Sequence, residues 1–172
     1  MKAIYVDAEG MPCAMSPDSA VVPNRRPWFI PDFGGEWAAR FLLAVRIGRL
    51  GKGIAPEFAS RYIDGVTVAV HPLPTESAVS DAISLFMDGA LILGDWIEMQ
   101  SLPILAGDAR VQVNAEFDVV AKAVSRTSRH ITLKTGDVIL IPVDCAAQML
   151  MLNSKLTAFA ADGTQVLSIN VK

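Results

Sequence analysis

The sequence predicts an α+β protein dominated by a mixed β-roll, in a single domain spanning residues 1–172. Strand patterns, either alternating or continuously apolar with β-branched residues, recur along the chain and outnumber segments with helical spacing. The length suits one domain, and the chain shows no repeat, linker or low-complexity segment. Hydrophobic residues make up 52% and mean hydropathy is +0.38. We interpret this surplus as a β-rich core or a buried interface between subunits.

The first part of the chain predicts short extended pieces separated by turns. Lys2–Val6 alternates like a strand and ends at a turn over Asp7–Gly10. Cys13–Met15 is a short extended piece, and Ser16–Ser19 is a turn or a helix start. Phe29–Phe33 is extended around Pro31, which limits it to a sheet edge or a loop.

The centre of the chain predicts the best-defined strands. Arg40–Arg49 is a nearly continuous apolar run, which is typical of a strand buried on both faces. Pro56 favours the first turn of a short helix over Glu57–Tyr62. Gly65–Val70 alternates as a further strand, and we expect Pro72 and Pro74 to end it.

The second half predicts one short helix and several strands. Glu76–Met87 has apolar residues on one side of a short amphipathic helix. The predicted strands are Gly89–Ile97 with a turn at Gly94 and Asp95, Val111–Val119, Ile139–Ile141, Leu156–Ala160 and Val166–Val171. The turn Ala161–Thr164 predicts that the last two strands form a hairpin.

Charge and cysteine content exclude several classes of function. The net charge is −3 and basic residues are scattered, so we expect no nucleic-acid partner. No apolar run is long enough to span a bilayer, and the first ten residues lack signal-peptide features, so we expect a cytoplasmic protein without membrane contact. Cys13 and Cys145 have no metal-type spacing and are expected to be reduced structural thiols.

Seven segments, in order, are similar to the fumarylacetoacetate hydrolase family. They are Ser16–Ala20, Trp28–Phe33, Val45–Lys52, Phe58–Val70, Asp88–Trp96, Thr132–Ile139 and Ala160–Lys172. Each motif is weak by itself, but the ordered set is specific. The resemblance implies the β-roll of that family's catalytic domain, and an activity that cleaves or isomerises acylpyruvates and related diketo acids.

The resemblance also implies that the family's metal site is lost here. Family members hold Mg²⁺ or Ca²⁺ with a Glu-x-Glu pair on the strand before Val45, where alternate residues share one face. The matching positions are Arg40 and Leu42, and His71 stands where a third carboxylate is expected. Glu36 is a carboxylate nearby, but one carboxylate does not make a site. We therefore expect no metal cofactor.

Other groups that the family's reaction needs are also replaced. The two histidines are His71 and His130, and neither lies near the N-terminus, where the resemblance places the general base. The lysine expected before Asp88 is replaced by Leu85–Met87, and the family's Thr-Gly-Thr-Pro loop by Ile141–Asp144. These losses together favour a protein that does not catalyse the family's reaction.

The degenerate site still predicts a pocket lined by Glu36, Arg40, Leu42 and His71. Arg40 could occupy the vacated metal space and meet an anionic ligand or Glu36, or it could lie at a solvent-facing strand end. His71 could be a new ligand or base, or a partly buried histidine satisfied by hydrogen bonds. We assign no catalytic residue from the sequence, and His71 and Arg40 are the candidates.

Two hypotheses follow. In the first, the protein is a catalytically inactive module with a structural, ligand-binding or partner-binding role, either as a homodimer or with an active family relative. In the second, it is a hydrolase or isomerase with a rebuilt, metal-free site. Arg40 would then replace the cation, His71 would serve as acid–base, and a small oxo-acid would be the substrate.

Overall fold

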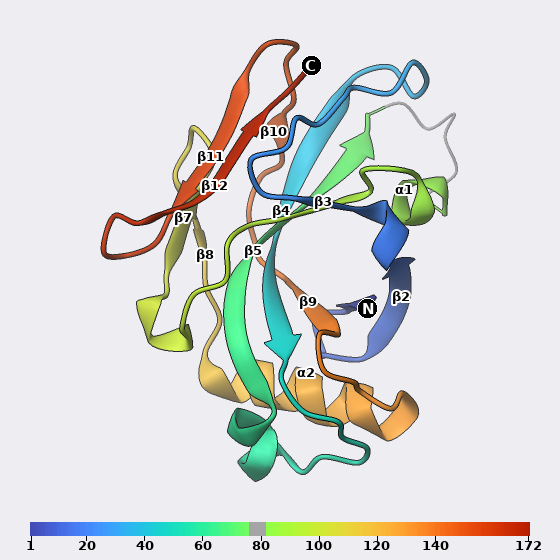
Figure 1. The fold of residues 1–172 in the computed structure, drawn as a ribbon, viewed down its shortest axis with the longest axis vertical. Helices are drawn as coiled ribbons and strands as arrows, with labels where there is room; N and C mark the ends of the chain where they lie inside the picture. Colours follow the sequence, from blue (N-terminus) through green and yellow to red (C-terminus); the bar gives the residue numbers. More distant parts are fainter. Residues whose placement is uncertain (76–81) are drawn as a thin grey trace.

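The computed structural model describes residues 1–75 and 82–172, which form two β-sheets and a few helices (Figure 1). The strands are β1 Lys2–Val6, β2 Pro12–Pro17, β3 Val21–Pro23, β4 Trp37–Ile47, β5 Ile63–Pro74, β6 Leu91–Leu93, β7 Ile104–Ala106, β8 Val111–Val113, β9 Val138–Pro142, β10 Gln148–Met149, β11 Lys155–Phe159 and β12 Gln165–Asn170. The helices are α1 Ile83–Phe86, α2 Phe117–His130 and the 3₁₀ helices η1 Asp18–Ala20, η2 Pro56–Arg61 and η3 Met99–Ser101. The predicted β-rich mixed fold is confirmed.

The larger sheet curls until its two edges approach each other. Its strand order is β2-β1-β9-β4-β5-β6-β3, with β10 added beside β4. The outermost strands β2 and β3 would lie about 29 Å apart in a flat sheet. They are also consecutive in the chain, and the three residues of η1 between Pro17 and Val21 span at most about 14 Å. The sheet must therefore curl into a half-barrel with a concave interior.

The long antiparallel hairpin of β4 and β5 forms the back of this half-barrel. Alternate β4 residues point to opposite faces. Trp37, Phe41 and Leu43 face the convex side and belong to the main core. Leu42 and Ala44 face the concave side and belong to a smaller second core. This explains why the run is apolar throughout, as expected for a strand buried on both faces.

The convex side is covered by the second sheet and by α2 (Figure 1). The second sheet has the order β12-β11-β7-β8, and its inward residues join the main core. The hairpin of β11 and β12 turns at Ala161–Thr164 as predicted, with Gly163 in the left-handed region at φ +86°. The concave side remains partly open at one end.

The helix α2 corrects the prediction of a strand over Val111–Val119. The strand ends at Val113, and the helix runs over Phe117–His130. Val120, Val124 and Thr127 follow the helical period and are buried. Serine and threonine make up much of this buried face, which weakened the apolar signal in the sequence. Asp118 in the first turn and Arg129 in the last turn suit the helix dipole.

The expected end of β5 at the prolines was also wrong. The strand continues through Pro72, which pairs with Ala39, to Pro74, which pairs with Trp37. β6 pairs with β5 only at Ala69 and Val70. Beyond Val70 no described strand pairs with β5 on its β6 side, so that side is a sheet edge. Proline, which lacks an N–H donor, is tolerated at such an edge.

Smaller differences concern the ends of elements. The strand expected over Gly89–Ile97 is limited to Leu91–Leu93, and the helix expected over Glu57–Tyr62 is a 3₁₀ helix over Pro56–Arg61. Of the helix expected over Glu76–Met87, the part up to residue 81 lies outside the described residues, and Ile83–Phe86 is helical. The turn at Asp7–Gly10 is confirmed by the hydrogen bond from Gly10 N to Asp7 O.

Candidate ligand site at the mouth of the half-barrel

Three of the four predicted site residues lie together at the open end of the concave face. Arg40 on β4 is directly opposite His71 on β5, so both side chains leave the sheet on the same side. Leu42 lies two residues further along β4 on that face and is buried. The residues that replace the family's three expected metal ligands are therefore neighbours in space.

Glu36 does not join this group. It precedes β4 by one residue and lies about 13 Å along the strand direction from Arg40. Its backbone carbonyl accepts hydrogen bonds from the Thr75 N–H and hydroxyl, while its side chain is exposed. No ion pair joins Glu36 to Arg40 within residues 1–75 and 82–172.

Tyr5 completes the floor of the site from the far side of the half-barrel. β1 and β5 are separated by β9 and β4, which corresponds to about 14 Å in a flat sheet. Nevertheless the rings of Tyr5 and His71 are 5.2 Å apart, tilted by 54°. The curl of the sheet thus brings the two side chains into contact across the concave interior.

The buried hydroxyl of Ser16 on β2 ties Tyr5 to helix α1. Ser16 donates to the backbone carbonyl of Leu85, and its oxygen lies 3.4 Å from the Tyr5 hydroxyl. The Ser16 hydroxyl is also placed to donate to the Tyr5 oxygen, so it lies between the Tyr5 ring and the Leu85 carbonyl. Burial raises the pKa of Tyr5 to about 12, opposed by the hydrogen bond with Ser16 and by the charge of Arg40. Tyr5 is therefore neutral at physiological pH.

His71 is buried and neutral. Its Nε2 lies 3.0 Å from the carbonyl oxygen of Ser84, which can only accept, so Nε2 carries the proton and Nδ1 does not. Burial lowers the pKa of His71, the bond to Ser84 opposes this, and the charge of Arg40 adds to the lowering. The hydrogen-bonded histidine expected from the sequence is the arrangement observed, and one basic nitrogen is retained.

Arg40 differs from its neighbours because it is exposed. It is the single exposed residue of β4. Within the described part of the chain no hydrogen bond or ion pair involves its guanidinium, although its charge acts on Tyr5, Cys13 and His71. A cation at the mouth of a half-buried polar site is thus available to an anion.

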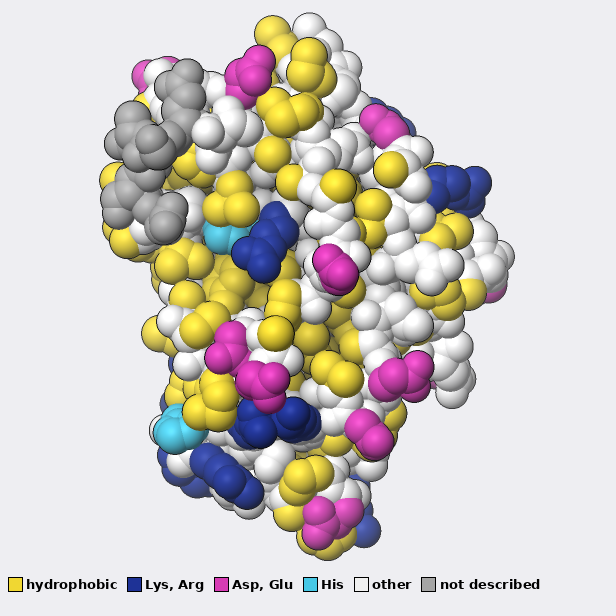
Figure 2. Space-filling view, turned by 180° about the vertical axis from the view of Figure 1, so that it is seen from behind, with side chains coloured by type: hydrophobic (Ala, Val, Ile, Leu, Met, Phe, Trp, Pro, Cys, Tyr) yellow, Lys and Arg dark blue, Asp and Glu magenta, His cyan; other side chains and the backbone are white. Residues whose placement is uncertain are grey.

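Arg40 also lines a cavity of about 400 Å³ between the strand ends and α2. Its other charged walls are Asp7, after β1, and Asp144, after β9. Val119, Ile141 and Val143 supply apolar walls. The volume is within the range of pockets that bind small molecules. Figure 2 shows one face of the molecule, on which a basic side chain lies next to a histidine above a mainly hydrophobic area with acidic side chains at its lower border.

The donor set at this site does not fit the divalent ion of the family. Mg²⁺, Ca²⁺ and Mn²⁺ prefer carboxylate and other oxygen ligands, whereas a guanidinium repels a cation and an isobutyl group offers no donor. Among the described residues no three His, Cys, Asp or Glu side chains cluster in a way that could hold a metal ion.

No helix in the described residues is long and apolar enough to cross a membrane.

The remaining candidates from the sequence have ordinary surroundings. Cys13 and Cys145 are free thiols. Burial raises the pKa of Cys13, and the charge of Asp7 adds to this. Arg126 and Lys122 both form ion pairs with Glu9.

Comparison with known proteins supports the resemblance at the level of the fold. Neither a protein-family model nor a curated protein matches the sequence. Among solved structures, 5-carboxymethyl-2-hydroxymuconate delta-isomerase from Mycobacterium smegmatis matches with a TM-score of 0.82 and 20% identity, over 99% of this chain and 78% of that chain. Fumarylpyruvate hydrolase from Pseudomonas aeruginosa, in complex with Mn²⁺ and pyruvate, matches with a TM-score of 0.76 and 17% identity, over 99% and 88%.

A protein from Yersinia pestis CO92 assigned to the fumarylacetoacetate hydrolase family matches with a TM-score of 0.73 and 19% identity, over 99% of this chain and 91% of that chain. The present protein therefore has the fold of the fumarylacetoacetate hydrolase family across its described length. The fold expected from the ordered motifs is confirmed.

Sequence reasoning missed several residues of the site. Tyr5 was placed on a strand but not assigned to the pocket, because only the curl of the sheet brings it to His71. The sequence placed Asp7 in a turn, and Ser16 in a turn or at a helix start. Alternation within Lys2–Val6 puts Tyr5 on one face with Ala3, but no sequence signal indicates which strand lies opposite.

Proposed function

We propose that this protein binds a small organic acid at the mouth of its half-barrel without a metal ion, and does not carry out the metal-dependent reaction of the family. The observation that carries the proposal is Arg40, an exposed guanidinium with no partner in the described residues, at a position where the family has a metal-ligating carboxylate. A guanidinium binds a carboxylate with two parallel hydrogen bonds. Arg40 would thus supply the positive charge for the anion that the metal ion is expected to supply in the family.

Preorganisation of the surroundings supports the proposal. His71 is fixed by the Ser84 carbonyl, and Tyr5 and Ser16 are linked below it. A rigid, partly dry floor beside Arg40 strengthens its attraction to an anion, because the local dielectric constant is lower than in water. A ligand such as pyruvate would place its carboxylate on Arg40.

The experiment is calorimetric titration of the protein with pyruvate in the presence of a chelator. We expect binding that Arg40→Gln weakens by tenfold or more, equivalent to about 1.4 kcal/mol. Arg49→Gln is the matched control, because Arg49 is also an exposed arginine but follows the far end of β4. Absence of pyruvate binding, or equal loss in both variants, would refute the assignment of Arg40.

A metal-free enzyme is the second candidate, favoured by the proton-free Nδ1 of the neutral His71 beside Arg40. In that case acylpyruvate would be turned over in a chelator, and His71→Gln would abolish the turnover while leaving pyruvate binding intact. Glutamine can still donate to the Ser84 carbonyl, so this variant tests the base rather than the packing. No turnover by the unmodified protein would eliminate this candidate.

Self-association belongs to the same proposal. Fourteen large hydrophobic side chains are exposed in the described residues, including Phe29 at 68%, Leu152 at 64% and Met151 at 61%, and exposed apolar side chains that gather in one patch mark interaction surfaces. We expect a homodimer or higher oligomer, or association with an active relative of the same fold. Light scattering that gives the 18.4 kDa of one chain across micromolar concentrations would contradict self-association.

A further inference from the structure

The cavity beside Arg40 carries both signs of charge, and these charges do not neutralise each other. Arg40, Asp7 and Asp144 all line it. No nitrogen of Arg40 lies within 4.0 Å of either carboxylate, because no such ion pair occurs among the described residues. The cavity therefore offers a cationic group and two anionic groups that are not paired with each other.

Hydrogen bonds from the backbone hold one of the two carboxylates in place. Oδ1 of Asp7 accepts hydrogen bonds of 2.9 Å from both the Glu9 and Met11 N–H groups, which fixes the side chain. Its Oδ2 has no partner in the described part of the chain. Asp144 follows the end of β9, two residues after Pro142, which pairs with Leu42 on β4. The acidic side chains therefore come from the segments that follow β1 and β9, and the basic side chain comes from β4.

We propose that the ligand of this cavity is a zwitterion, an amino acid whose carboxylate binds Arg40 and whose ammonium binds between Asp7 and Asp144. The apolar walls from Val119, Ile141 and Val143 would receive an apolar side chain. A simple oxo-acid still binds through Arg40, but it has no cation to meet the two carboxylates, so we expect it to bind more weakly than the matching amino acid. The inference rests on the proposed function, since Arg40 is the carboxylate partner in both.

The test compares ligands that share a carbon skeleton. Chelator-treated protein is titrated with L-alanine against pyruvate, and with L-phenylalanine against phenylpyruvate. We expect each amino acid to bind at least tenfold tighter than its oxo-acid, with L-phenylalanine tighter than L-alanine. Ethylamine, which has an ammonium but no carboxylate, should bind much more weakly than L-alanine.

Replacing each aspartate by asparagine tests whether its charge acts on the ligand, because the expected effects on L-alanine and on pyruvate differ in sign. Asp144→Asn and Asp7→Asn should each weaken L-alanine several-fold and leave pyruvate unchanged or tighter, because a like charge has been removed. Asn at position 7 can keep the two bonds to the turn N–H groups. Asp32→Asn is the matched control, since Asp32 is exposed and does not line the cavity.

The outcomes separate the two proposals. If pyruvate binds as tightly as L-alanine and the Asp variants change neither, the zwitterion inference is wrong and organic-acid binding stands. If ethylamine binds as well as L-alanine, Arg40 is not the carboxylate partner and the inference also falls. If no ligand of either kind binds, the proposed function and the inference fail together.

Discussion

Arg40 faces His71 directly across the β4–β5 ladder, and the pKa of the imidazole is lowered first by burial and further by this cation. Removing the charge should therefore raise the pKa of His71. Arg40→Gln tests this by NMR titration of the imidazole resonances. The chain has two histidines, so His71→Gln assigns the signals and His130 serves as an internal reference. An unchanged pKa for His71 would mean that the Arg40 guanidinium does not lie close to the imidazole.

The buried His71 also predicts a pH dependence of stability. Its folded pKa is below the unfolded value of about 6.5, so the unfolded chain binds the extra proton more readily. Stability should be unaffected by this group above about pH 6.5 and should fall as the pH decreases below it. Thermal unfolding between pH 7.5 and 5 is the measurement. In His71→Gln the fall over this window should be smaller, and an identical fall would contradict the burial of the imidazole.

Asp137 predicts a second, more acidic window. Burial opposes ionisation of this carboxyl, but hydrogen bonds from the Lys2 side chain and from the Lys134 and Lys2 N–H groups hold its pKa below the ordinary 3.8. Its contribution is present above that value and is lost as the pH falls further. Asp137→Asn should reduce the free energy of unfolding by about 2 kcal/mol, as expected for hydrogen bonds to a charged group.

Urea unfolding of Asp64→Asn is the control for that variant. Asp64 pairs with Arg46, but both side chains are substantially exposed. Exposed pairs contribute between about 0 and 1 kcal/mol. If both variants lose the same stability, the buried position of Asp137 does not matter.

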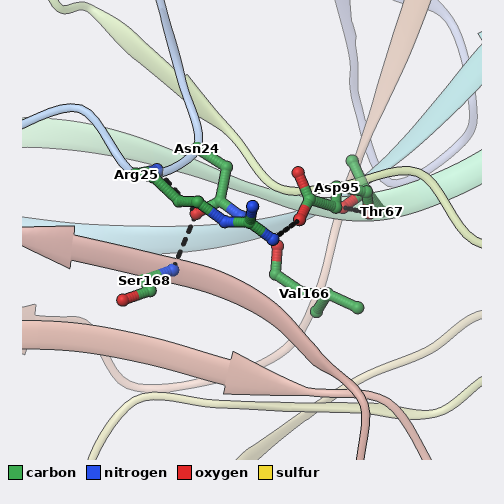
Figure 3. A network of polar contacts seen from close by, with 6 residues as sticks. All are labelled: Asn24, Arg25, Thr67, Asp95, Val166 and Ser168. Carbon is green, nitrogen blue, oxygen red and sulfur yellow. Dashed lines mark hydrogen bonds and ion pairs between the residues drawn. The ribbon is translucent and has the colours of Figure 1, made fainter.

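Asn24 joins the two sheets through its side-chain amide (Figure 3). Its Oδ1 accepts from the Ser168 N–H at 2.8 Å, and its Nδ2 donates to the Val166 carbonyl at 3.2 Å, so the amide caps the edge of β12. Asn24→Ala should cost about 1–2 kcal/mol and accelerate hydrogen exchange at the Ser168 amide. Arg25→Ala removes the adjacent exposed ion pair with Asp95 and should change little.

The sequence predicted local features better than spatial neighbours. β1, β4 and the final hairpin follow from alternation, burial and turn residues, and their structure agrees. α2 was missed because serine and threonine occupy part of its buried face. The continuation of β5 through Pro72 was missed because a local sequence does not show whether a strand lies at the edge of a sheet. For the site, alternation on β4 put Arg40 and Leu42 on one face. The contact of Tyr5 with His71 depends on the curl of the whole sheet.

The most direct test of the account is a comparison of pyruvate binding with and without metal. Calorimetry with pyruvate is performed in excess EDTA and again in excess Mn²⁺, for the unmodified protein and for Arg40→Gln. The account predicts the same affinity in both buffers, with loss in the variant and no heat of Mn²⁺ binding in the absence of pyruvate. Pyruvate binding that requires Mn²⁺ and persists in Arg40→Gln would contradict the account, because a metal site would then have survived the replacement of its expected ligands.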